Sequence, residues 1–219
     1  MRVKLHRFWE EERNLFVLLF FLSIHMFVII PFGQDAIVTR ILAFIFYTFI
    51  LIAGWRYLKE AYRFGHLLII GTIAIILLLA VGTFMQRPWV AALSDSFIIL
   101  YCGLLAWIVL MKTFSEGPIT IYRIEGSIVV YLLIGLIFAN AYQLVYSFYP
   151  ANSFKGLQSG DNKEFLYFSF VSLTTVGYGD ITPAIPLSRS LANLESLLGQ
   201  LYPAILIARL VSMEFSQRK

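Results

Sequence analysis

The chain has 219 residues, of which 59% are hydrophobic and only 14% are charged. A typical soluble domain is closer to half apolar and a quarter charged, so the composition excludes an ordinary soluble protein. The apolar residues gather in long runs with few charges, each near the ~20 residues that a helix needs to cross a bilayer. The sequence therefore predicts an integral membrane protein whose surroundings are the lipid bilayer.

The formal net charge of +4 has a simple explanation in such a protein. Lys and Arg flank membrane helices on the cytoplasmic side, so we expect no nucleic-acid partner. The single cysteine, Cys102, cannot form an intrachain disulfide. The sequence has neither a cluster with metal-ligand spacing nor a Ser/His/Asp set, so we expect no enzymatic activity and no soluble small-molecule ligand.

Six apolar runs are long enough to be membrane spans. The first follows a basic stretch that three glutamates interrupt, and no small-residue cleavage site follows it, so we expect a retained helix rather than a signal peptide. The predicted fold class is an all-α membrane protein with six transmembrane helices. They cover residues 14–30, 39–57, 66–85, 89–111, 127–149 and 186–213.

The distribution of Lys and Arg tests this topology. With both termini in the cytoplasm, twelve of the 17 basic residues lie inside, in agreement with the positive-inside rule for a plasma (cell inner) membrane protein. Two cytoplasmic termini require an even number of spans. The short apolar run at 164–174 is therefore predicted to re-enter the membrane without crossing it. The linker 115–126 has two interpretations, an interfacial helix or a plain loop.

The hexapeptide TVGYGD follows the short apolar run directly. A cation in a narrow pore must exchange water for other oxygens, and backbone carbonyls supply them if successive carbonyls point at the pore axis. Alternating normal and left-handed backbone gives that geometry, and glycine adopts the left-handed region freely, so we expect Gly177 and Gly179 there. The neighbouring side chains then point into the supporting wall. The predicted ion-binding residues are Thr175, Val176, Gly177 and Tyr178.

Residues 127–213 resemble the pore domain of the potassium channel superfamily, with an outer helix, a pore helix, a selectivity filter and an inner helix. The filter matches the K⁺-selective form of the family without substitution. The resemblance is to six-span channels of prokaryotic type with a single pore loop. It implies passive K⁺ conduction, with K⁺ as the permeant ion and no other cofactor. It divides the chain into a four-helix domain (1–114), a cytoplasmic linker (115–126) and a pore domain (127–219).

The chain contains one filter segment, and one strand cannot enclose an ion. Four copies are required to close a ring, which predicts a homotetramer with fourfold symmetry and a tetrameric pore. Two alternatives stay open. One is a weakly selective cation channel, and the other is a non-conducting membrane subunit that assists assembly.

The filter needs support from the pore helix. In the family, the aspartate after the filter commonly bonds an aromatic residue of that helix, often a tryptophan. Here Asp180 faces Tyr167 at the matching position, whose hydroxyl can take the same part, whereas Phe168 is expected only to pack on Tyr178. This departure predicts a less cross-linked filter wall, and plain packing of both aromatics is the alternative. The predicted support residues are Gly179, Asp180, Tyr167 and Phe168.

In the predicted inner helix, Gly199 falls 20 residues after Gly179, the spacing at which the family often carries a hinge glycine. Pro203 follows one turn later and removes a helical hydrogen bond. Close helix packing at Gly199 is the alternative. Ile207 and Val211 are predicted to form an apolar gate.

Glu195 is an ionisable residue inside the same helix, where such residues are costly and usually paired. We expect it to hydrogen-bond Asn140, Gln143 or the back of the pore helix, in a role that is structural rather than functional. The fourth predicted span differs from a voltage sensor because no basic residue occurs between Arg87 and Lys112. Steep voltage gating by that route is therefore not expected.

Overall fold

The computed structural model describes residues 15–30, 88–115, 120–150 and 152–217, together with scattered positions within 41–53 and 72–81. A helix over Leu15–Ile29 ends in the π-helical turn η1 (His25–Ile29). Two long helices follow, α5 (Pro88–Thr113) and α6 (Ile121–Phe148). The spans predicted at 39–57 and 66–85 lie mostly outside the described residues.

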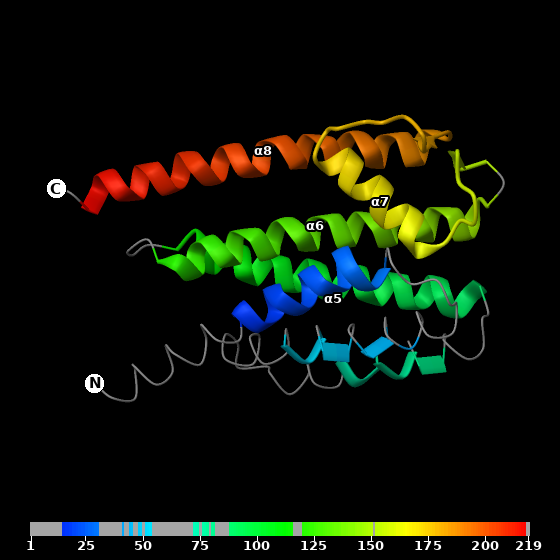
Figure 1. Ribbon diagram of the computed structural model, residues 1–219, viewed down its shortest axis with the longest axis horizontal. Coiled ribbons are helices and arrows are strands. Elements are labelled where there is room, and N and C mark those ends of the chain that lie inside the picture. The colour runs from blue at the N-terminus through cyan, green and yellow to red at the C-terminus, as the bar shows by residue number, and fades with distance from the viewer. Residues whose placement is uncertain are drawn as a thin grey trace.

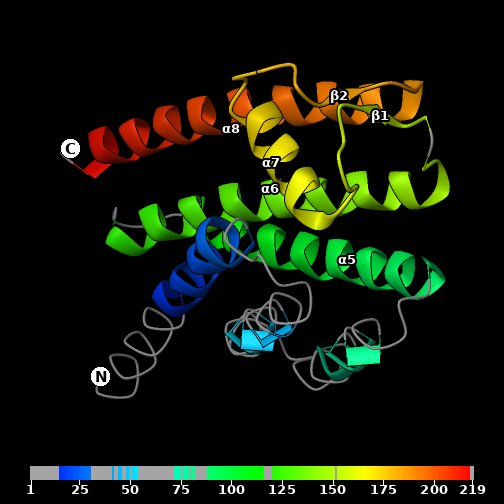
Figure 2. The same ribbon diagram turned by 45° about the vertical axis from the view of Figure 1, so that its right-hand side comes forward.

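The remaining elements build the predicted pore region. Strand β1 (Phe154–Lys155) is followed by the short helix α7 (Asn162–Leu173), strand β2 (Thr182–Pro183) and the long helix α8 (Pro186–Gln217). The two strands pair antiparallel, with Phe154 opposite Pro183. Helices α5, α6 and α8 lie lengthwise beside one another, and α7 crosses between α6 and the first half of α8 (Figures 1 and 2).

Three described helices are long and apolar enough to cross a membrane: Trp89–Thr113, Ile121–Phe148 and Pro186–Met213. They correspond to the spans predicted at 89–111, 127–149 and 186–213. Helix α6 begins six residues earlier than expected, so the second half of the linker 115–126 is its first turns and not a separate segment. The extended residue Thr120 precedes it, and Gly126 does not break it because that glycine packs closely on Thr113 of α5.

Two apolar clusters hold these helices together. The first joins the helix Leu15–Ile29 to α5 and α6 through buried leucines, among them Leu18, Leu105 and Leu133. The second cluster fixes α7, which corresponds to the predicted pore helix, between α6, β1 and α8. Its buried aromatic residues contact one another edge to face, which aromatic rings favour. They are Tyr142, Phe154, Phe165 and Phe168, and the ring of Phe138 lies tilted against Tyr142.

Candidate functional site: the re-entrant helix and filter loop

The N-terminus of α7 is capped in the way that the sequence allows. Asp161 is extended and its carboxylate accepts the N–H of Glu164 at 3.4 Å, so Asp161 caps the helix. The Glu164 carboxylate in turn accepts backbone N–H groups from Gln158, Ser159 and Gly160 at 2.7–3.3 Å. One side chain therefore ties the preceding loop to the start of the pore helix.

After α7 the backbone alternates between positive and negative φ from residue 175 to residue 179. Gly177 has φ 62° and Gly179 has φ 80°, as expected, and Thr175 has φ 58°. Thr175 is the one non-glycine residue with positive φ in the described part of the chain. A β-branched residue adopts this region only at a cost of about 1–3 kcal/mol, so surrounding contacts must impose it.

Those contacts are hydrogen bonds from the loop back to the last turn of α7. The N–H groups of Thr175 and Val176 donate to the carbonyls of Ser172 and Val171, both at 3.0 Å, and Gly177 N–H donates to Val171 at 3.4 Å. Among the described residues, no hydrogen bond ends on a carbonyl oxygen of residues 174–179. The loop is thus anchored through its donors, and its row of carbonyl oxygens remains available to a cation.

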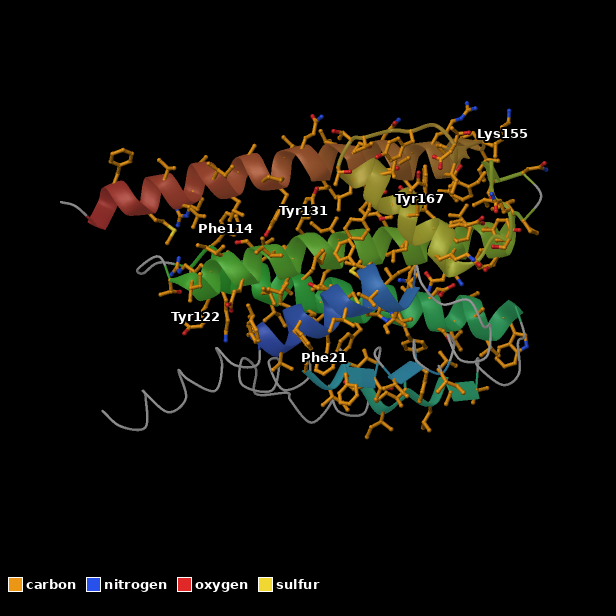
Figure 3. The ribbon with its side chains drawn as sticks, in the orientation of Figure 1. Phe21, Phe114, Tyr122, Tyr131, Lys155 and Tyr167 are labelled. Carbon is orange, nitrogen blue, oxygen red and sulfur yellow. The ribbon has the colours of Figure 1, made fainter. Side chains whose placement is uncertain are left out.

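Tyr167 lies beside the far end of the predicted filter loop (residues 175–180). It makes both of the contacts that we expected from the two aromatic residues, packing on Tyr178 and a bond to Asp180. Its ring stacks on Tyr178, with centroids 6.4 Å apart and planes 2° apart. Its hydroxyl bonds the Asp180 carboxylate, and this bond holds the pKa of Asp180 below its usual value. Figure 3 shows Tyr167 on α7.

The expectation for Phe168 was wrong. Phe168 is buried and its ring contacts Tyr142 and Phe154 rather than Tyr178. Consecutive residues on a helix point in directions about 100° apart, so only one of the two aromatics can face the filter. Tyr167 takes that face, and Phe168 anchors α7 to α6.

Glu195 is fully buried and contacts the back of the pore helix, as one of the three expectations proposed. Its Oε1 lies 2.5 Å from the Ser169 hydroxyl of α7, and its Oε2 accepts from the Tyr142 hydroxyl of α6 at 2.5 Å. Asn140, expected as a partner, instead donates to the Leu136 carbonyl of its own helix at 2.7 Å. Gln143 is likewise not a partner, and its Oε1 is buried with no hydrogen bond among the described residues.

Gly199 lies against the C-terminal end of α7. A Cβ at Gly199 would overlap the Leu173 carbonyl, so α8 approaches the pore helix backbone to backbone. One turn away, the Ser196 hydroxyl donates to Ser172 at 3.1 Å. Close packing is therefore the role that the structure gives Gly199. The predicted hinge stays a prediction, and it retains one physical basis: Pro203 has no N–H to donate to the Gly199 carbonyl.

The predicted gate residues Ile207 and Val211 lie one turn apart on α8 and are both exposed in the single chain.

Near this C-terminal end of α8, two guanidinium groups bind backbone carbonyls just after the end of α5. Arg123 donates to the Ser115 carbonyl at 2.7 Å, and Arg209 of α8 donates to Phe114 at 3.4 Å. Figure 3 places Phe114 near this end of α8 and Tyr131 between α6 and α8. The Tyr131 ring stacks on Tyr202, which joins the same two helices.

Residues 126–216 match the family model described as "Ion channel". This segment, 91 of the 219 residues, is therefore similar to ion channels.

Two curated relatives are similar to part of the chain. They are Protein LctB of Geobacillus stearothermophilus and Protein LctB of Bacillus caldotenax, each 46% identical over 46 residues. That match covers 21% of this chain and 34% of each relative, so it spans about a third of their length. No solved structure matches the chain.

Proposed function

We propose that the protein conducts K⁺ selectively and passively across the plasma membrane. The observation that carries this proposal is the backbone of the filter loop, in which Thr175, Gly177 and Gly179 have positive φ and alternate with Val176 and Tyr178. This alternation turns successive carbonyls toward one side, and the N–H groups of Thr175, Val176 and Gly177 are bound to α7. Rings of such carbonyls replace the hydration shell of K⁺.

The conducting unit is a homotetramer, because one loop cannot surround an ion. The inner helix supports this proposal. In the single chain only 11% of the apolar stretch of α8 is buried, against 61% for α6. Leucines 194, 197 and 201 repeat at helical spacing along the uncovered surface. Copies of this chain around a fourfold axis would cover that surface and bring four loops together.

Charge along the chain supports the orientation. The excess of Lys and Arg on one side of the predicted topology favours two cytoplasmic termini, and with this orientation the filter loop lies toward the outer face. The C-terminal end of α7 points toward the interior of the membrane, where its negative dipole end favours a cation in the cavity.

The test is a potassium flux assay on purified protein in liposomes, with barium as a blocker. Wild type should carry a barium-sensitive K⁺ flux that Gly177→Ala abolishes, since alanine is strained in the left-handed backbone at φ 62°. Gly103→Ala is the matched control because an added Cβ there meets nothing within 4 Å. Absence of flux in wild type would favour a non-conducting assembly subunit. Equal flux in Gly177→Ala would show that this loop is not the conduction path.

A further inference from the structure

The carboxyl group of Glu195 lies where the outer, pore and inner helices meet. Its side chain is fully buried, and each of its oxygens lies 2.5 Å from a hydroxyl group, Ser169 on one side and Tyr142 on the other. The Ser169 oxygen is also 2.7 Å from the Gly135 carbonyl of α6. These contacts form one continuous chain of hydrogen-bonding groups from α8 through α7 to α6.

The number of protons shared by these hydrogen-bonding groups decides whether Glu195 is ionised or neutral. Ser169 has one hydroxyl proton but lies within hydrogen-bond distance of two acceptors, Glu195 Oε1 and the Gly135 carbonyl. If Glu195 is ionised, one of these contacts joins two oxygens with no proton between them. If Oε1 carries a proton, it donates to Ser169, Ser169 donates to Gly135, and Tyr142 donates to Oε2. Every contact then has one donor and one acceptor.

The charges around Glu195 favour the same state. Tyr142 and Tyr131 are the titratable groups of α6 on this side. On α7, Lys163 pairs with Asp161, Glu164 binds the preceding loop and Tyr167 binds Asp180. On α8 itself, Arg189 donates to the Pro183 carbonyl.

None of these described groups brings a positive charge to Glu195. An unpaired carboxylate buried at membrane depth is costly, so the neutral acid is the favoured form.

We propose that Glu195 carries a proton and, as a neutral acid, is a positioning residue that holds the pore helix against α6 and α8. This inference rests on the proposed function, because the position of α7 sets the position of the filter loop through the bonds at Val171 and Ser172. Removal of the proton turns the Ser169 hydroxyl from Gly135 to the carboxylate. The Ser169–Gly135 hydrogen bond between α7 and α6 is then lost, and alkaline solution should reduce conduction.

Two readouts on reconstituted protein test this proposal independently. Infrared spectroscopy of the full-length channel detects the carbonyl stretch of a protonated carboxylic acid, and wild type at neutral pH should show a band that Glu195→Gln lacks. Glu164→Gln, which changes a glutamate at the start of the same pore helix, should keep the band. Barium-sensitive K⁺ flux is then measured from neutral to alkaline pH, below the range in which tyrosines ionise at ~10.

Wild-type flux should fall about tenfold as the band disappears, whereas Glu195→Gln should stay within about twofold across the range, because its amide preserves the donor to Ser169 and the acceptor for Tyr142. In Tyr142→Phe the anion loses a donor, so the loss of flux should move to higher pH. A neutral-pH spectrum without a band that depends on Glu195 would overturn the proposal. So would a flux loss that is identical in wild type and Glu195→Gln. A band without flux in any variant would refute the proposed function while leaving the proton on Glu195 established.

Discussion

Replacing Gly199 with alanine tests how the inner helix lies against the pore helix. A Cβ at Gly199 would overlap the Leu173 carbonyl oxygen and lie 2.7 Å from its carbon and 3.1 Å from its Cα. Backbone atoms cannot rotate away as a side chain can, so we expect overpacking of about 1–3 kcal/mol. The better helix propensity of alanine offsets roughly 1 kcal/mol of this. The net loss of stability should therefore be up to about 2 kcal/mol.

Two other glycines provide a graded series for the same measurement, the free energy of unfolding of the purified protein. Gly103→Ala meets nothing within 4 Å and should be stabilising by up to about 1 kcal/mol. Gly135→Ala would meet the Phe170 ring at 2.8 Å, and because a ring can shift, its effect should lie between the other two. If Gly199→Ala is as stable as Gly103→Ala, the helices do not approach this closely and the packing argument is refuted.

Substitutions at four further residues test the ends of the pore region. Tyr167→Phe removes the bond that lowers the pKa of Asp180. The bond forms while Asp180 is ionised and is lost as pH falls through the lowered pKa, so acid inhibition of flux should begin at higher pH in Tyr167→Phe than in wild type. An unchanged acid profile would count against the bond. Glu164→Ala removes the acceptor of three backbone N–H groups, so a protease should cleave the loop at 156–160 faster than in wild type. Glu164→Gln should show an intermediate cleavage rate. Equal cleavage rates in all three proteins would contradict the role of Glu164 in holding this loop. Arg123→Gln should lower the free energy of unfolding by about 1 kcal/mol, and Arg209→Gln should lower it by less. The reason is that the hydrogen bond from Arg123 to the Ser115 carbonyl is 2.7 Å long, whereas the one from Arg209 to the Phe114 carbonyl is 3.4 Å long. The reverse order of the two effects would refute this reasoning.

The sequence predicts the three long described helices and the left-handed backbone at both filter glycines, because hydropathy and glycine spacing report on these features directly. The apolar runs at 89–111, 127–149 and 186–213 correspond to long helices, and both filter glycines have positive φ. The start of α6 was harder to predict, since residues 121–126 are compatible with helix or loop and contact with α5 decides between them.

Tertiary contacts account for what the sequence does not predict. Ser169 and Tyr142 are ordinary apolar-helix residues in the sequence, and nothing local marks them as partners of Glu195, 26 and 53 positions away. Asn140 was the more obvious partner by polarity, but in a helix its side chain can reach the carbonyl one turn earlier. The left-handed backbone at Thr175 is also hidden, since threonine normally avoids it and the bond to Ser172 supports it here.

The close contacts on the inner side of the pore helix modify the prediction of a loosely held filter. Glu195, Ser196 and Gly199 of α8 contact Ser169, Ser172 and Leu173 of α7, so this face of the pore helix is joined to the inner helix at three successive points. Movement of α8 at this level would therefore displace the end of α7 from which the filter loop starts. We expect gating motions of the inner helix to be transmitted to the filter.

The most direct test of the central claim is the reversal potential of the reconstituted channel with K⁺ on one side of the membrane and Na⁺ on the other. A filter built from the carbonyls of residues 175–178 predicts a reversal potential displaced strongly toward the K⁺ equilibrium potential, and Gly177→Ala should carry no such current. A wild-type reversal potential near zero, with equal passage of both ions, would contradict K⁺ selectivity.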